Sequence, residues 1–494
     1  MNKRTLCKKI ACVLVLANLA SALAVTGCSS KNEIDPSGTP EVTEAPMKSV
    51  TEMFAVIGKD YYVPFQNPEH SYCTINEGYG APLREQGMGG CYSYAAVTSM
   101  QSNYLQKNGE LIDINPIDII YRIYEAPEKD KNGQPQYPKE KFYLDTVSPL
   151  DLGGDAMRVT GALCADPLNG YLISETAVLG AYNATVKGTP TITIDDVKAA
   201  IRNHGAVCLG INYKKDCKIV NGFYTQNHPT NVEDMDHVAT IVGWDDDFPA
   251  ECFTIPASRN GAWLVQNSFG PFWGNAGYYW VSYDTPLPDL VKYSVTKEYS
   301  SAISYGRFAT GTIISTDVVA MLEGGKDPEK ITLEDISNSN DLTIATVFEK
   351  KGNVAAIGIW TTVPNQPYTI EILDGEFGKV LASTSGTFDS WGYHTVKLDT
   401  PVSVKKFTVV LKIAGEYFFE GGPADSVRVS TAIRKTEAHY EAKTKPGRSF
   451  IKVGEEWVDV TDPTLISRLG IEEMDNKYLE AGTIGDPCIT VLFK

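Results

Sequence analysis

The sequence predicts an α+β protein with two folded domains, and three observations support this prediction. Between about residues 51 and 292 helix-period and strand-period patterns both occur, with helices early and strands late. From about residue 293 helical periodicity nearly disappears, and short β-rich runs are separated by turns rich in Gly, Asp, Asn and Pro. The chain has 494 residues, enough for two cores. We therefore expect an α+β domain over 51–292 and an all-β sandwich or jelly roll over 293–494.

Two helices are well marked in the first domain. One begins at Cys91, repeats apolar residues at four-residue spacing, and ends at Gly109 after a basic last turn. The other spans about 194–204, with acidic residues in its first turn and Gly205 directly after it. Apolar runs predict strands at 206–212, 238–244, 262–266 and 277–283.

In the second domain, five runs have the composition and spacing of strands. They cover 354–362, 367–373, 392–398, 406–413 and 426–433. Trp360, Trp391 and Trp457 belong to this region, and we expect them to pack inside or along the sheets rather than to stack on sugars.

The N-terminus has the pattern of a bacterial lipoprotein signal. A basic start is followed by an apolar run over 10–25, and small residues directly precede Cys28. The run is shorter than the ~20 apolar residues that a bilayer-spanning helix needs. We expect residues 1–28 to be the signal, Cys28 to carry lipid and attach the mature protein to the membrane, and residues 29–50 to form a flexible linker. The alternative is an ordinary signal peptide cut near Ala24.

Charge and cysteine content exclude several classes of function. The formal charge is −17, and loss of the four basic residues of the signal lowers it to −21. Without a block of Lys or Arg, nucleic acid is not an expected partner. The cysteines outside the signal show no CxxC or other metal-type spacing. We expect no metal and no cofactor.

Three distant residues point to thiol chemistry. Cys91 follows a glycine-rich loop and opens a helix, His237 stands at the head of an apolar strand, and Asn267 follows another strand. A thiol attacks an amide as thiolate, which a helix N-terminus and an imidazolium both stabilise. Cys91 is then the nucleophile, His237 the base and acid, and Asn267 the residue that orients the imidazole. The Cys91 N–H and the Gln86 amide suit the developing oxyanion.

The segments around these residues resemble the papain-like cysteine protease family. Gln86-Gly and Cys91-Tyr-Ser-Tyr-Ala are similar to its nucleophile segment, Asp-His237-Val-Ala to its histidine strand, and Asn267-Ser-Phe-Gly-Pro-Phe-Trp-Gly to its asparagine segment. The resemblance implies a two-lobed catalytic domain, one lobe helical and one β-barrel-like. It also implies that Gly153 and Gly154, ahead of a helix, present backbone to an extended substrate.

The chain departs from the family pattern near the nucleophile and the imidazole. Gln86 stands five residues before Cys91 rather than six, and we expect Gly89 and Gly90 to absorb the shorter loop through unusual backbone angles. Tyr92 and Phe269 stand where the family has tryptophans. From about residue 355 to Trp457 the chain resembles the lectin-like β-domain of secreted bacterial members of the family.

These features together predict an extracellular, lipid-anchored cysteine endopeptidase that acts on peptides or proteins through a thioester acyl-enzyme. One alternative is a catalytically weakened papain fold that binds glycans or host proteins through its β-domain. Another is transglutaminase or amidase chemistry, which shares the cysteine and histidine but usually takes a carboxylate in place of Asn267.

Overall fold

A computed structural model describes sixteen segments of the chain. They are residues 50–86, 89–124, 128–129, 135–136, 142–144, 152–184, 186, 189–213, 217–229, 235–307, 313–315, 332–419, 427–431, 435–438, 444–469 and 485–494. The predicted signal, Cys28 and all but the last residue of the predicted linker lie outside them. None of the helices in these segments is both long and apolar enough to cross a membrane.

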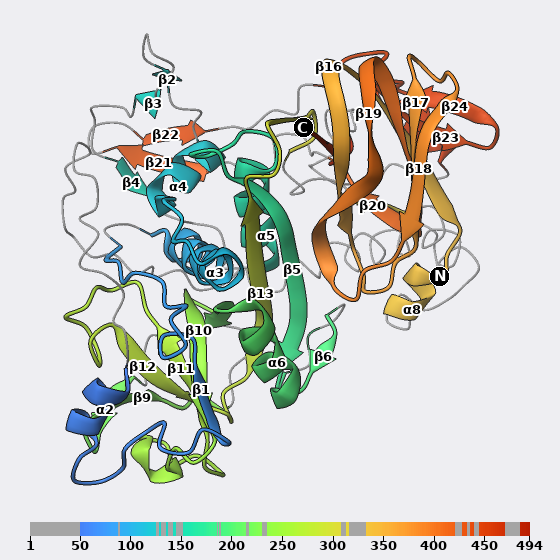
Figure 1. The fold of residues 1–494 in the computed structure, drawn as a ribbon. Helices are drawn as coiled ribbons and strands as arrows, with labels where there is room; N and C mark the ends of the chain where they lie inside the picture. The colour runs from blue at the N-terminus through green and yellow to red at the C-terminus, as the bar shows by residue number, and fades with distance from the viewer. Residues whose placement is uncertain are drawn as a thin grey trace.

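The first domain places helices against a mostly antiparallel sheet (Figure 1). Its elements are α2 (Thr51–Ile57), β1 (Ser71–Cys73), α3 (Cys91–Asn108), α4 (Pro116–Tyr124), β2 (Glu128–Lys129), β3 (Pro135–Gln136), β4 (Phe142–Leu144), α5 (Leu152–Leu163), β5 (Leu172–Tyr182), β6 (Thr191–Ile192), α6 (Ile194–His204), β7 (Val207–Ile211), β8 (Lys218–Val220), β9 (Phe223–Gln226), β10 (His237–Asp245), the 3-10 turn η1 (Ala250–Cys252), β11 (Ala262–Gln266), β12 (Tyr278–Ser282) and β13 (Leu287–Thr296).

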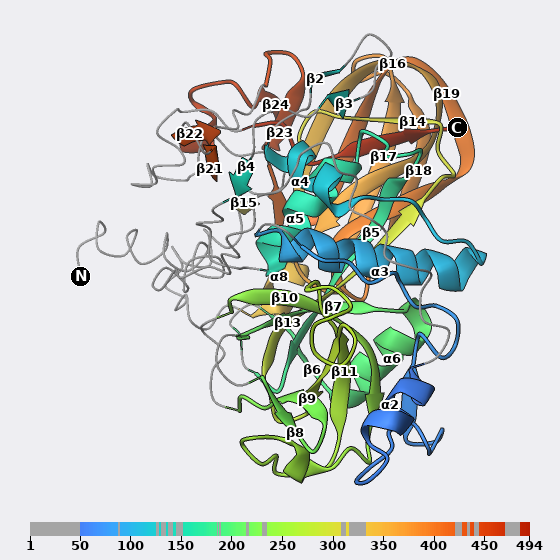
Figure 2. The ribbon, with the colours of Figure 1, turned by 90° about the vertical axis from the view of Figure 1, so that its left-hand side faces the viewer.

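The two predicted helices are present with the predicted ends. Gly109 follows α3 in the left-handed conformation, at a φ of 70°, and its N–H bonds the Leu105 carbonyl. Before α6, Thr193 and Asp196 form a capping box, in which each side chain accepts from the other residue's backbone N–H. The helix α3 packs against β7, β10 and β13 and lies across the middle of the molecule (Figure 2). The predicted α+β character is confirmed.

The strands that carry the candidate site are neighbours. In the antiparallel sheet β7 pairs with β10, β10 with β11, and β11 with β12. Each of these four strands is buried along its whole length. Helix α3 shares a core cluster with Val238 of β10, and α6 shares another with the next residue, Ala239, so the two helices cover opposite faces of the sheet. The segment from Val50 to Cys73 adds a third cluster with residues of β10, β11 and β12. Phe54 of α2 contacts Trp280 at a ring separation of 5.3 Å. The segment before Cys91 is therefore part of this domain's core.

The second domain consists almost entirely of strands. Its elements are β14 (Ser301–Ser304), β15 (Ile313–Ser315), α8 (Leu333–Ser337), β16 (Asp341–Thr361), β17 (Tyr368–Asp374), β18 (Val380–Gly386), β19 (Trp391–Ala414), β20 (Glu416–Phe418), β21 (Val427–Thr431), β22 (Lys435–Ala438), β23 (Ser449–Val453), β24 (Glu456–Asp459), α9 (Leu465–Arg468) and β25 (Thr490–Phe493).

Two long strands organise this domain. The predicted strands 392–398 and 406–413 are both parts of β19, which pairs with β16 from end to end. Register shifts between Glu349 and Gly352 and between Val354 and Ala356 bend the pair. One half of β16 then pairs with β23 and the other with β25, as bulged strands do when they serve two sheets. Trp360 is 1% exposed, so it is a core residue.

Two predictions about the second domain need correction. The predicted boundary between residues 292 and 293 lies inside β13, which continues to Thr296 and pairs with β5 of the first domain. The predicted sandwich strand 426–433 is present as β21, but it pairs with β22 and with β4 of the first domain. Figure 1 shows β21 and β22 beside β4, away from the sandwich. Both differences arise because a strand pairs with a segment that is distant in the sequence.

The two domains share a sheet. Strand β5 pairs with β13 on one side and with the start of β19 on the other, where Trp391 is opposite Val178 and His394 opposite Glu175. Backbone hydrogen bonds therefore cross the domain junction, and His394 is buried there.

Candidate active site

The histidine and the asparagine meet because their strands are neighbours. His237 is the first residue of β10, and Asn267 follows the last residue of β11. The two strands are antiparallel, with Thr240 opposite Gln266, so the start of one lies beside the end of the other. His237 Nε2 lies 2.8 Å from Asn267 Oδ1. Both side chains are buried.

This bond fixes the tautomer of the imidazole. Asn267 Oδ1 also accepts a hydrogen bond from the Ser268 N–H at 2.8 Å, which identifies it as the oxygen of the amide. His237 Nε2 must then donate its hydrogen to Oδ1, and in the neutral ring Nδ1 carries the lone pair. Nδ1 is buried and has no hydrogen-bond partner among the described residues. The ring thus presents a basic nitrogen on the side away from Asn267.

Aromatic rings cover the imidazole. Phe269 stacks on it, with ring centroids 4.9 Å apart and planes 30° apart. Tyr213, which follows β7, approaches at 5.4 Å with a tilt of 52°. Phe269 stands where the resembled family has tryptophan, and it thus keeps an aromatic ring over the His237–Asn267 bond. Sequence reasoning did not find Tyr213, because only the pairing of β7 with β10 brings it to the site.

The surroundings favour the neutral imidazole. Burial lowers the pKa of His237, while the hydrogen bond to Asn267 and the negative charge of Asp236 oppose that shift. A neutral ring with Nδ1 unprotonated is the state that a base needs before it accepts a proton.

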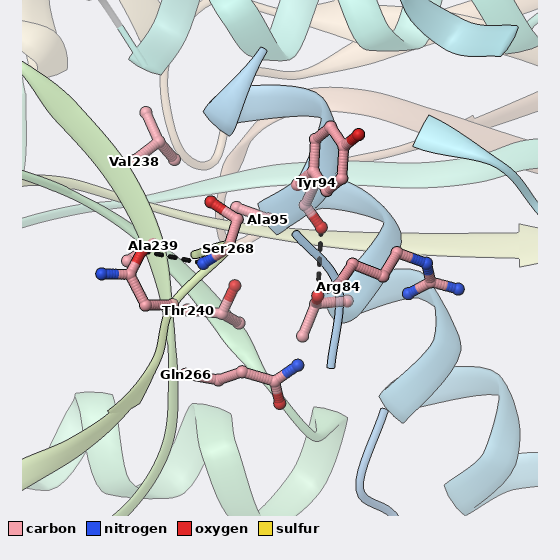
Figure 3. A pocket seen from close by; sticks show the side chains of 10 residues that line it. Arg84, Tyr94, Ala95, Val238, Ala239, Thr240, Gln266 and Ser268 are labelled. Atoms are coloured by element: carbon pink, nitrogen blue, oxygen red, sulfur yellow. Dashed lines mark hydrogen bonds between the residues drawn. The ribbon is translucent and has the colours of Figure 1, made fainter. Parts of the chain in front are cut away.

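Cys91 is the first residue of α3, which packs against β10, the strand that begins at His237. The helix α3 has Gly90 as its N-cap, and Cys91 is 7% exposed. One turn further on, Tyr94 and Ala95 line a small cavity with Val238, the residue after His237, and with Asn267. Figure 3 shows this cavity between the helix and the strand. Its volume of about 10 Å³ is that of a single water site, so this cavity is too small to hold a peptide.

Gly90 has a different role from the predicted one. Its φ is −134°, which any residue can adopt, so it does not absorb the short loop through an unusual angle. A Cβ on Gly90 would lie 2.4 Å from Ile120 Cδ1. A side chain at this position would force the buried Ile120 of α4 to move, because α4 packs closely against the start of α3.

Gln86 is tied to the asparagine segment. Its backbone N–H bonds the Ser268 carbonyl at 2.8 Å, and its Oε1 accepts a hydrogen bond from the Ser268 hydroxyl. This hydrogen bond identifies the oxygen of the Gln86 amide and fixes the orientation of the amide. The amide nitrogen, which is the donor, does not face the Ser268 hydroxyl. Ser268, like Tyr213, was not predicted from the sequence as a site residue. Its position directly after Asn267 was the only signal that could have indicated it.

Three predicted site residues remain, Gly153, Gly154 and Cys28. Gly153 and Gly154 are in the first turn of α5, not ahead of the helix as predicted. Their role in substrate binding stays a prediction. Cys28 lies outside the described residues.

The sequence models of two protein families match the chain. The sequence model of the papain family of cysteine proteases matches residues 175–303, and that of the lectin-like domain matches residues 330–468. The first match includes His237 and Asn267. The two matches follow one another in the order that the sequence resemblance implied, a papain-family cysteine protease domain and then a lectin-like domain.

Curated relatives and solved structures are similar to the chain. Mouse cathepsin K is 20% identical over 208 residues, which cover 41% of this chain and 56% of the relative. Human cathepsin L2 is 24% identical over 223 residues, covering 42% and 59%. The chain thus spans little more than half the length of these relatives.

Among solved structures, the clostridial cysteine protease Cwp84 after propeptide cleavage is 17% identical, with a TM-score of 0.59 and coverage of 85% of this chain and 98% of the other. A crystal structure of the cysteine protease and lectin-like domains of Cwp84 from Clostridium difficile is also 17% identical, with a TM-score of 0.55 and coverage of 92% and 99%. At this identity the likeness shows a shared fold.

Proposed function

We propose that the protein is a cysteine endopeptidase in which Cys91, His237 and Asn267 act as a catalytic triad. The observation that carries this proposal is the 2.8 Å bond from His237 Nε2 to Asn267 Oδ1, which leaves Nδ1 as the basic nitrogen of a ring covered by Phe269. The order of the residues along the chain and the papain-family match support it. Gly153 and Gly154 would present backbone to the extended substrate.

The proposed reaction is acyl transfer through a thioester. His237 Nδ1 takes the proton of the Cys91 thiol, and the sulfur attacks the carbonyl carbon of the scissile amide. The Cys91 N–H and the Gln86 side-chain amide stabilise the negative oxygen that forms. The C–N bond then breaks as His237 returns the proton to the leaving amine. Water, activated by the same imidazole, attacks the thioester and releases the acid and the thiol.

The test is hydrolysis of a peptide library by the folded body, with and without Cys91→Ala. We expect Cys91→Ala to abolish cleavage, and a thiol-reactive peptide mimetic to label the wild type at residue 91. Cys217→Ala is the control, because Cys217 is a half-buried cysteine that does not belong to the proposed triad. Equal cleavage by the wild type and Cys91→Ala would refute the proposal. Transfer of acyl groups to added amines without hydrolysis would point to transglutaminase chemistry instead.

We further propose that the protein acts outside the cell membrane, attached through lipid on Cys28. The basic start, apolar run and small residues before Cys28 support this, as does the surface-layer association stated for Cwp84. Mass spectrometry of the membrane fraction should find a lipid-modified N-terminal Cys28, and Cys28→Ala should release the protein. An unmodified N-terminus near residue 25 would contradict the anchor.

The alternative of a surface binding protein has one structural observation in its favour. Phe377, at a φ of +57°, contacts the half-buried rings of Trp457 and Phe450 at 5.0 and 5.3 Å on the β-domain. A bulky residue in the left-handed region is strained, and such strain is often found at functional sites. Retention of the isolated protein on a glycan array, lost in Trp457→Ala, would support binding by this group.

A further inference from the structure

Three polar side chains meet in the cavity between α3 and the sheet. Thr240 and Gln266 are directly opposite each other on β10 and β11, so both point from the same face of the sheet. Thr98 of α3 lines the same cavity from the side of the helix. Figure 3 shows the side chains of Thr240 and Gln266 extending from their strands toward the helix. The volume of about 10 Å³ corresponds to one water site.

Each of these side chains stands close in the sequence to a member of the proposed triad. Thr98 is two helical turns after Cys91 and therefore lies on the same face of α3. Thr240 follows His237 along β10, and Gln266 is the last residue of β11, directly before the orienting asparagine. The cavity therefore lies where the helix that carries the proposed nucleophile meets the strands that position the base.

The three side chains are buried and have hydrogen-bonding capacity that the protein does not use. The Thr98 hydroxyl donates to the Tyr94 carbonyl at 3.0 Å, so its oxygen can still accept a hydrogen bond. Gln266 Nε2 donates to the Pro82 carbonyl at 3.2 Å, and Gln266 Oε1 is buried without a partner among the described residues. Thr240 is 1% exposed, and its hydroxyl has no hydrogen bond to the described part of the chain. Buried polar groups of this kind take up a partner, and a water fits a cavity of this size.

We propose that one ordered water binds in this cavity to the hydroxyls of Thr98 and Thr240 and to the Gln266 amide. Three partners are the usual number for a buried water. Because this water links α3 to both strands, it sets the spacing between Cys91 and His237, and loss of one partner lets the helix shift against the sheet. The inference rests on the proposed triad and adds three positioning residues that act without touching the substrate.

The direct test is a crystal structure of the wild-type protein at a resolution that shows ordered waters. We expect one water within hydrogen-bond distance, about 3.2 Å at most, of Thr98 Oγ1, Thr240 Oγ1 and the Gln266 amide. The structure of Thr240→Val should lack this water. A wild-type cavity without a water, or the same water in Thr240→Val, overturns the inference whatever the activity of the protein.

The kinetic test compares Thr240→Val with Thr240→Ser, which keeps the hydroxyl. Valine keeps the shape of threonine and suits a strand, so the variant should fold. We expect kcat for peptide hydrolysis to fall about tenfold in Thr240→Val, a part of the roughly 10²-fold that a 1 Å displacement of a catalytic group costs. KM should change little, because the cavity is too small to hold a peptide. Thr240→Ser should restore most of kcat.

Labelling of Cys91 by iodoacetamide at a series of pH values tests the spacing itself. An imidazolium stabilises a thiolate at short range, so a wider spacing in Thr240→Val should raise the pH at which labelling is half-maximal. Thr346→Val is the matched control, because Thr346 is 1% exposed on β16 of the second domain, and its kcat and labelling profile should equal those of the wild type.

The possible failures can be told apart. Wild-type kcat and a wild-type labelling profile in Thr240→Val overturn this inference and leave the proposed triad intact. Absence of both cleavage and labelling in the wild type overturns the peptidase function instead, and the crystal structure then still decides whether the water is bound.

Discussion

At the scale of single residues, the site depends on which atom of each amide faces which partner. Asn267 Oδ1 accepts two hydrogen bonds, from the imidazole and from the Ser268 N–H. The Ser268 hydroxyl in turn holds Gln86 Oε1. Ser268 thus helps to fix both the residue that orients the base and the proposed oxyanion donor.

The Asn267→Ala variant tests the orienting role. Removal of Oδ1 leaves the buried Nε2–H without its acceptor and lets the imidazole turn, and small misplacements of a catalytic group cost about 10²-fold in rate. We expect kcat for peptide hydrolysis to fall by about that factor with little change in KM. A kcat within twofold of the wild type would show that packing against Phe269 alone holds the ring.

The Gln86→Ala variant tests the oxyanion role. Loss of one preorganised donor typically lowers kcat by about 10²–10³-fold, because the charge it stabilises exists only in the transition state. We expect that loss in steady-state kinetics, with KM nearly unchanged. Ser268→Ala is the companion variant: it removes the hydroxyl that holds Oε1 but leaves the donor, so its kcat should fall less. If both variants lost kcat equally, the role of Gln86 would be structural.

At the scale of elements, the start of α3 is set by its contact with α4. Gly90 has an ordinary backbone angle, yet an added Cβ would lie 2.4 Å from Ile120 Cδ1. This contact lies directly beside Cys91, the first residue of α3.

We therefore expect Gly90→Ala to destabilise the protein by about 1–3 kcal/mol, the usual cost of overpacking a core. The measurement is the free energy of unfolding from urea denaturation. Ile120→Val removes the clashing Cδ1, so the double variant should be more stable than Gly90→Ala alone. Additive losses in the double variant would contradict a direct clash.

At the scale of the whole molecule, the shared sheet makes the domain junction part of the fold. His394 of β19 is buried against β5, where its ring stacks on Phe388 at 3.9 Å and its Nε2 donates to the Ser390 carbonyl at 3.1 Å. Its other nitrogen lies 3.9 Å from Glu175, and Lys292 is nearby. Burial first, and Lys292 as well, lower the pKa of His394 from 6.5 to about 4.

This shift predicts acid sensitivity of the junction. Between pH 6.5 and 4 the unfolded chain binds a proton at His394 that the folded chain does not, so stability falls as the pH falls through that range. The shift corresponds to roughly 3 kcal/mol. In His394→Gln the loss of unfolding free energy between pH 7 and pH 4 should be smaller by about that amount, as measured by urea denaturation at each pH. An unchanged loss would show that other groups control acid unfolding.

Local patterns in the sequence determined the α+β class, the ends of α3 and α6, and the order of Cys91, His237 and Asn267. Periodicity, capping residues and short motifs are properties of neighbouring residues, so they can be read without a structure. The tertiary structure decided that Tyr213 and Ser268 join the site, that Gly90 is needed for packing, and that β21 leaves the sandwich. These features depend on which distant segments pair, and that pairing is set by side-chain packing and backbone hydrogen bonds across the whole chain.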